Sequence, residues 1–171
     1  NYAVVFKLPV VFVCENNLYM EYTPIGSITA VENPAADRAC AYGLESILID
    51  GNDADEVYRT AQAAYARARA GEGPSLIECK TYRHSGHSRA DPGAYRPEGE
   101  LDDWKTNRDP IKMYRARLKE FGIAEKVIDQ IDQEAMARVD EATEAAKASP
   151  PPPAEILTTD VYADGGWAWR N

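Results

Sequence analysis

The sequence is poor in cysteine and histidine, with 3 cysteines and 2 histidines among 171 residues. Cys14, Cys40 and Cys79 are odd in number, lie far apart and form no CxxC pair. This pattern fits neither a disulfide framework nor a structural zinc site. We therefore expect all three to be buried, reduced thiols.

The sequence also lacks long apolar runs and an excess of basic residues. No run approaches the roughly 20 apolar residues that a membrane-spanning helix needs, and the first residues do not resemble a secretory signal. Lys and Arg number 19 against 28 Asp and Glu, which gives a net charge of -9. Because such a surface repels nucleic acid and anionic lipid, we expect neither as a partner. The expected location is the cytoplasm, or the mitochondrial matrix in a eukaryote.

What the sequence does contain is an alternation of apolar strands and helices. Continuous apolar runs at residues 9–14, 46–49 and 75–79 predict strands, and the first is expected to be buried on both faces. Helices are expected at 34–42 and after Asp53, which has the position of an N-cap. The fold class predicted is α/β, with a parallel sheet flanked by helices. Because residues 1–6 look like the end of a helix, we expect the chain to begin within a domain.

A helical tail is expected to follow the sheet. Asp109 before Pro110 is typical of a helix start, and apolar residues step by three or four from 124 to 148. Prolines 150–153 form a stiff connector. We therefore expect one domain at residues 1–100 and a tail at 101–171. Trp167 and Trp169 either dock at an interface or extend freely.

Two loops after predicted strands carry the polar residues of interest, and ligands gather at such loops in parallel sheets. The first contains Asn16 and Asn17, whose amide oxygens suit a hard cation such as magnesium that shares its ligands with phosphate. Paired asparagines are also common turn formers. On its own, this motif leaves both interpretations open.

The second loop, TYRHSGHSRADP at 81–92, contains both histidines, His84 and His87. Imidazole transfers protons near neutral pH, and Gly86 allows close approach of the backbone to a ligand. A surface turn with incidental histidines is the alternative. Guanidinium groups suit phosphate or carboxylate, and three lie in or near the loop: Arg83, Arg89 and Arg96.

Taken together, the motifs resemble one family. LPVVFVCENNLY, followed by GPSLIECKTYRHSGHSRADPGAYRPEGE and then by DWK and RDPI, is similar to the alpha subunit of thiamine-diphosphate-dependent dehydrogenases that feed lipoyl complexes. The resemblance covers about residues 1–163. It implies an incomplete thiamine-diphosphate-binding fold, with thiamine diphosphate and Mg2+ as cofactors.

The resemblance also implies roles for individual residues. Asn17 offers its side-chain oxygen and Tyr19 its main-chain carbonyl to the magnesium ion that clamps the cofactor diphosphate, and Asn16 shapes their turn. His87 lies next to the diphosphate and the reactive ring, where it assists proton transfer and acyl handover. Arg83 supports the loop or the phosphates.

Two further residues of the second loop have different expected roles. His84 is a bystander or stabilises the loop, because the family varies at this position. Ser88 matches the position that mitochondrial members present to an inhibitory kinase, where a phosphate would add negative charge beside an anionic cofactor.

One departure from the family pattern concerns the Gly-Asp-Gly triplet that supplies the remaining magnesium ligand. It should precede the asparagine pair and is not found in this sequence. Asp50-Gly51 does not replace it, because this pair follows a later strand and lacks the first glycine. We therefore expect either a fragment or an incompletely represented subunit, which binds the cofactor poorly by itself.

The function implied is decarboxylation of pyruvate or cleavage of acetoin, with transfer of the acyl group to a lipoyl acceptor. The implied partners are a beta subunit in an alpha2-beta2 heterotetramer, a lipoyl acyltransferase and a small-molecule substrate. One alternative is a branched-chain 2-oxoacid enzyme. The other is a non-catalytic interaction domain that docks through the long helix and the terminal tryptophans.

Overall fold

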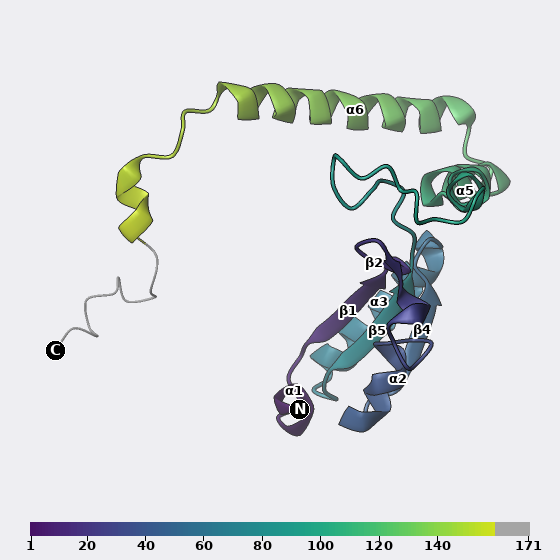
Figure 1. Ribbon diagram of the computed structural model, residues 1–171, viewed down its shortest axis with the longest axis vertical. Coiled ribbons are helices and arrows are strands. Elements are labelled where there is room, and N and C mark those ends of the chain that lie inside the picture. The colour runs from purple at the N-terminus through teal and green to yellow at the C-terminus, as the bar shows by residue number, and fades with distance from the viewer. Residues whose placement is uncertain (160–171) are drawn as a thin grey trace. The chain divides into compact units, whose positions relative to one another are not determined.

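A computed structural model describes residues 1–159. The chain divides into two compact units, Asn1–Gly122 and Ile123–Asn171, which are described separately. The first has the predicted α/β architecture, with a parallel sheet and helices on its faces (Figure 1).

The sheet consists of β1 (Val11–Asn16), β4 (Ile47–Asp50) and β5 (Ser75–Lys80), in the order β1-β5-β4. Both pairings are parallel, and Lys80 lies opposite Asn16 on one side and Asp50 on the other. All three strands therefore end at the same level. They correspond to the three predicted strands, but β1 begins and ends two residues later, so that Asn16 belongs to the strand and not to the loop.

The expectation that β1 is buried on both faces is wrong for this chain. Phe12 is 46% exposed and Val13 is 57% exposed. Within residues 1–159, β1 pairs with β5 alone and forms one edge of the sheet. Its apolar side chains are therefore covered less completely than those of the central strand β5.

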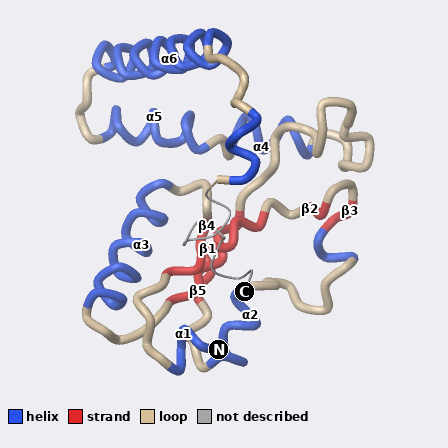
Figure 2. The backbone as a smooth tube through the Cα atoms, turned by 90° about the vertical axis from the view of Figure 1, so that its left-hand side faces the viewer, coloured by secondary structure: helices blue, strands red, loops and turns tan. Residues whose placement is uncertain are grey.

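Helices cover the two faces of the sheet. Figures 1 and 2 show α3 (Ala54–Arg69) on one face and α2 (Ala36–Ala39) on the other. Because side chains alternate along a strand, Ile77 and Cys79 pack toward α3, while Glu78 between them points toward α2. The sheet thus has an apolar face under α3 and a buried carboxylate on the opposite face.

Shorter elements complete the first unit. No helix was predicted at α4 (Glu100–Asn107), because its mostly polar sequence has no apolar periodicity. The helix predicted at 34–42 is split between α2 and η2 and ends at Gly43. The remaining elements are α1 (Tyr2–Val5), β2 (Tyr19–Met20), β3 (Thr23–Pro24), η1 (Ile25–Ser27), η2 (Cys40–Tyr42) and α5 (Pro110–Glu120).

The three cysteines are free thiols, as expected, but not all are buried. Cys79 is buried and Cys14 is half-buried, whereas Cys40 is exposed. Cys40 lies in the short helix η2, where its thiol donates to the Asp37 carbonyl oxygen at 3.3 Å. Because η2 is a single turn at the surface, the Cys40 side chain does not reach the core.

The second unit contains the long helix that the apolar spacing predicts. It is α6 (Glu125–Ala148), followed by the prolines and by η3 (Ala154–Thr158). Ile131 and Val139 of its apolar stripe are 55% and 57% exposed. Trp167 and Trp169 lie outside the described residues. Among the described helices, none is both long and apolar enough to cross a bilayer.

A charged cluster connects the start of α3 to α5. The Asp53 carboxylate accepts from the backbone N–H groups of Asp55 and Glu56 at 3.0 and 3.1 Å, which confirms it as the N-cap. Arg117 of α5 binds both carboxylate oxygens of Asp53, at 2.8 and 3.1 Å, and also contacts Asp55. These hydrogen bonds, that of Arg117 above all, lower the pKa of Asp53 to about 2.

This cluster predicts a defined response to acid. Because the pKa of Asp53 is depressed on folding, its contribution to stability is complete above the ordinary value of 3.8 and is lost as the pH falls through about 2. In the complete protein, Asp53→Asn should lower the free energy of unfolding at pH 7, and the difference from wild type should shrink between pH 4 and 2. Chemical denaturation across this range measures it. A constant difference would show that the carboxylate charge is not involved.

Candidate functional site

The loops that follow β1 and β5 meet at the carboxyl edge of the sheet (Figure 2). Arg83 donates from Nη2 to the main-chain oxygen of Glu21. The His87 ring meets the Tyr22 ring edge-on, with centroids 5.9 Å apart, and His87 Nε2 lies 3.9 Å from Glu21 Oε1. The two loops singled out from the sequence therefore lie side by side, as the parallel order of their strands leads one to expect.

The asparagine pair forms two overlapping turns after β1. Asn16 Oδ1 accepts from the Leu18 N–H, and Asn17 Oδ1 accepts from the Tyr19 N–H, both at 3.0 Å. Leu18 has a φ of 70°, a left-handed conformation that is unfavourable for a branched apolar residue. A carbonyl oxygen has two lone pairs, so the hydrogen bond at Asn17 leaves acceptor capacity for a cation.

A buried carboxylate supports this turn from the neighbouring strand. Glu78 in β5 is 0% exposed, and its Oε1 accepts from Asn16 Nδ2 at 2.7 Å. Burial by itself would raise the pKa of Glu78. The hydrogen bonds from Asn16, Ala36, Ala35 and Lys80 outweigh it and hold that pKa below its ordinary value.

Tyr19 is bound to the second loop and to α4 through its side chain. The hydroxyls of Tyr19 and Tyr82 donate to the same oxygen of Glu100, at 2.6 and 3.0 Å. Burial, together with the carboxylate of Glu100, raises the pKa of Tyr82 to about 12 and also raises the pKa of Tyr19. The Tyr19 side chain therefore serves as an anchor, which leaves its main chain as the part suited to a ligand.

The hydrogen bonds of His87 define its tautomer. Arg83 Nη1 lies 3.2 Å from His87 Nδ1, and a guanidinium group can only donate. Nδ1 is therefore the acceptor, and the neutral ring carries its proton on Nε2. The backbone N–H of His87 donates to Asp91 Oδ2 at 2.6 Å, which fixes the main chain as well.

The loop around His87 is folded closely on itself. A Cβ atom added at Gly86 would lie 2.5 Å from the Asp91 carbonyl oxygen, so only glycine fits there. Asp91 also accepts from the Gly93 N–H and the Tyr95 hydroxyl, at 2.8 and 2.9 Å. These bonds outweigh the desolvation of its carboxylate, and the pKa of Asp91 is lowered.

Two of the three arginines expected to suit phosphate or carboxylate, Arg83 and Arg96, make hydrogen bonds to protein groups of the two loops. Arg96 Nη2 donates to the carbonyl oxygens of Arg83 and Ser85, at 2.7 and 2.8 Å. Its guanidinium group lies 5.4 Å from the centre of the Tyr82 ring. Arg83 contacts Glu21, His87 and the Tyr95 hydroxyl. Both side chains therefore brace the loop.

Two further residues of the second loop join this network through their main chains: the carbonyl oxygen of His84 accepts from Arg96 Nη1 at 3.3 Å, and that of Ser88 accepts from the Asp91 N–H at 3.1 Å. His84 is half-buried, with its ring 6.1 Å from that of Tyr82. Ser88 and Arg89 are exposed. Of the two histidines, His87 is the one that contacts the first loop.

The oxygens of the first loop fit part of a magnesium site. Within residues 1–159, no three His, Cys, Asp or Glu side chains gather into a metal-binding group. The asparagine turn offers amide and main-chain oxygens instead, which magnesium accepts when phosphate and water supply its other ligands. This donor set suits a cation shared with a diphosphate better than a metal enclosed by protein side chains.

Sequence reasoning missed Glu78 and Glu100, each of which joins segments distant in the chain. Glu78 could have been found, because a lone carboxylate in an apolar strand signals a buried partner. Glu100 had no such signal, since it stands among other polar residues at the start of a helix that was not predicted.

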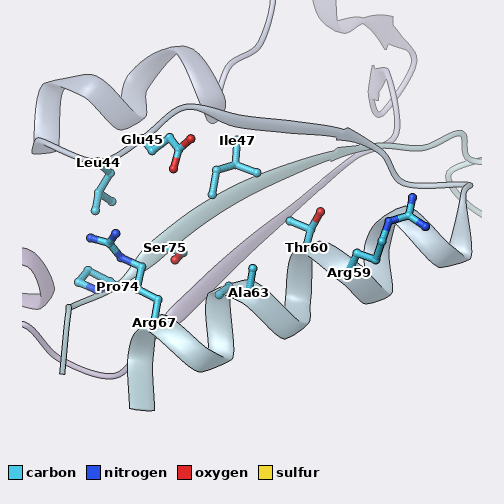
Figure 3. A pocket seen from close by; sticks show the side chains of 10 residues that line it. Leu44, Glu45, Ile47, Arg59, Thr60, Ala63, Arg67, Pro74 and Ser75 are labelled. Atoms are coloured by element: carbon cyan, nitrogen blue, oxygen red, sulfur yellow. The ribbon is translucent and has the colours of Figure 1, made fainter. Parts of the chain in front are cut away.

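A separate hollow of about 370 Å³ lies at the opposite edge of the sheet (Figure 3). It is lined by residues at the beginnings of β4 and β5 and by α3, among them Ile47, Ser75 and Arg67 (Figure 3). None of the candidate site residues lines it. Its distance from the two loops makes it a suitable place for control substitutions.

Comparison with known proteins agrees with the motifs. The chain matches the model of the dehydrogenase E1 component over residues 1–155. It is 43% identical to the alpha subunit of acetoin:2,6-dichlorophenolindophenol oxidoreductase of Cupriavidus necator, over 95% of this chain and 49% of that protein. Identity is also 43% to the alpha subunit of 2-oxoisovalerate dehydrogenase of Bacillus subtilis, with the same coverage.

A third relative is the alpha subunit of the pyruvate dehydrogenase E1 component of Zymomonas mobilis, 37% identical over 94% of this chain and 45% of that protein. The chain spans about half the length of the curated relatives that it matches. The match to the family model covers nearly all of the described residues, including both loops. This chain belongs to the dehydrogenase E1 component family.

Proposed function

We propose that this chain is part of the alpha subunit of a thiamine-diphosphate-dependent dehydrogenase. The subunit would act in the decarboxylation of pyruvate or the cleavage of acetoin, with transfer of the acyl group to a lipoyl acceptor. The observation that carries the proposal is the contact between the two loops at the carboxyl edge of the sheet. The loop that begins with the asparagine turn contacts the loop that contains His87. This contact brings oxygen ligands near a group that can transfer a proton.

In this proposal, Asn17 Oδ1 and the Tyr19 carbonyl oxygen bind the Mg2+ ion of the cofactor diphosphate. Asn16 holds the turn through its bond to the Leu18 N–H. When bound, thiamine diphosphate supplies the nucleophilic carbon and the electron sink for the substrate. The chain itself binds, orients and handles protons.

His87 is the proposed proton-transfer residue. Its neutral form carries the mobile proton on Nε2, because Nδ1 faces the Arg83 guanidinium group. Arg83 is a positioning residue, since it holds both the His87 ring and the Glu21 carbonyl oxygen. Ser88, exposed one position after His87, is proposed as a site where phosphorylation would inhibit.

The partners proposed are a beta subunit, in an alpha2-beta2 heterotetramer, and a lipoyl acyltransferase, within the cytoplasm or a mitochondrial matrix. These relatives are alpha subunits, which supports a beta partner. A branched-chain 2-oxoacid is the second candidate substrate, because the acetoin and 2-oxoisovalerate relatives are equally similar to this chain. The kcat/KM values for the three substrate classes distinguish these candidates.

Asn17→Ala tests the metal-binding role. In the complete alpha subunit assembled with its beta partner, the Kd for thiamine diphosphate at saturating Mg2+ should rise by at least about tenfold, since even residues that only orient metal ligands contribute this much. Isothermal titration calorimetry measures it. Arg67→Ala, beside the beginning of β5 at the opposite edge of the sheet, is the control and should bind normally. Wild-type affinity of Asn17→Ala would remove Asn17 from the magnesium ligands.

His87→Ala tests the proton-transfer role. The variant should retain much of its cofactor affinity, while acyl transfer to a lipoyl domain should slow by roughly 10²- to 10⁴-fold, the usual contribution of general acid–base catalysis. Rapid-quench kinetics with lipoyl domain as acceptor measures the transfer. His84→Ala changes the other histidine of the same loop and should have a much smaller effect. Equal rates in the two variants would rule out the special role of His87.

A further inference from the structure

We propose that Glu78 is a positioning residue for the magnesium-binding turn. Its carboxylate selects the orientation of the Asn16 amide and thereby holds Asn17 and Tyr19 in the geometry that binds a magnesium diphosphate. This inference rests on the proposed function. It goes beyond that proposal in assigning part of the cofactor affinity to a residue that does not itself touch the cofactor.

Four donors converge on the Glu78 carboxylate. Asn16 Nδ2 and Lys80 Nζ approach Oε1 at 2.7 and 3.1 Å, and the backbone N–H groups of Ala35 and Ala36 both donate to Oε2 at 2.8 Å. The carboxylate is 0% exposed, so water does not take the place of any of these partners. An acceptor-only group with two oxygens is the side chain that satisfies all four donors.

This arrangement sets the orientation of the Asn16 amide. Because Glu78 only accepts, the amide nitrogen of Asn16 must face it, and the amide oxygen must face the other way. That oxygen accepts from the Leu18 N–H at 3.0 Å and holds Leu18 at a φ of 70°. By fixing the orientation of the Asn16 amide, Glu78 therefore determines the backbone conformation of Leu18, which lies between the two proposed magnesium ligands.

We call the hydrogen bonds from the Asn16 amide nitrogen to Glu78, and from the Leu18 N–H to the Asn16 amide oxygen, the relay. Glu78→Gln should break this relay, although the substitution preserves the size and shape of the side chain. The new amide nitrogen must face either the backbone donors of α2 or the Asn16 amide. If Asn16 rotates its amide to accept, its own nitrogen then faces the Leu18 N–H, and the bond that holds the turn is lost. In either case, two hydrogen-bond donors face each other at one place in the relay, and one hydrogen bond is lost.

A second substitution restores the relay with its polarity reversed. In Glu78→Gln combined with Asn16→Asp, the oxygen of the new glutamine accepts from Ala35 and Ala36, and its nitrogen donates to the new aspartate. The other oxygen of that aspartate accepts from the Leu18 N–H. The exchange conserves the total charge and keeps the negative group within reach of Lys80.

The experiment compares wild type, each single variant and the double variant in the complete alpha subunit with its beta partner. Calorimetry measures the Kd for thiamine diphosphate at saturating Mg2+, and hydrogen exchange measures protection of the segment around Leu18 without cofactor. Glu78→Gln should weaken binding by roughly ten- to hundred-fold, as expected for residues that orient metal ligands, and should speed exchange. The double variant should recover most of both losses.

Asp53→Asn is the matched control, because it also converts a bonded carboxylate to an amide, at the α3 N-cap away from the turn. It should lower stability and leave the cofactor Kd unchanged. Should Glu78→Gln not fold, Asn16→Ala replaces it, since this variant cuts the relay and leaves Glu78 its other three donors.

The outcomes separate the two proposals. If Asn17→Ala weakens binding but Glu78→Gln, or Asn16→Ala in its place, binds as wild type does, the positioning role of Glu78 is overturned. Failure of the double variant to regain affinity would overturn it as well, because a purely structural carboxylate predicts no rescue by Asn16→Asp. If instead wild type does not bind the cofactor, it is the proposed function that fails. If Asn17→Ala binds normally, the proposed metal-binding role of Asn17 fails.

Discussion

The parallel pairing of β1 with β5 is the constraint on which the candidate site depends. It places the end of β1 beside the end of β5, with Asn16 opposite Lys80, although more than sixty residues of chain lie between them. Both loops must therefore leave the sheet at the same edge. The contacts between Arg83 and Glu21, and between His87 and Tyr22, follow from this common origin.

Two buried or half-buried carboxylates convert this proximity into a defined geometry. Glu78 connects the asparagine turn to the start of α2, and Glu100 connects Tyr19 and Tyr82 to the start of α4. Each carboxylate accepts from more than one segment, so moving one segment disturbs the others. Charge-assisted hydrogen bonds of this kind are stronger than neutral ones and suit the task of holding loops in place.

The arginines of the second loop take part in the same framework. Arg83 and Arg96 both donate to main-chain oxygens. Arg83 also donates to the Tyr95 hydroxyl, and the Arg96 guanidinium group lies over the Tyr82 ring. The loop thus owes its shape to side chains that composition alone would assign to phosphate binding.

The sequence by itself determined the three strands of the sheet, the helices α3, α5 and α6, and the two loops of this protein. Apolar runs, the N-caps Asp53 and Asp109, and the turn-forming asparagines act within a few residues, so their effects are visible in the local pattern. Only the tertiary structure decided the partners of Glu78 and Glu100, the helix α4, the tautomer of His87 and the exposure of β1. These depend on contacts between residues far apart in the chain, and no local periodicity encodes which donors will meet a given acceptor.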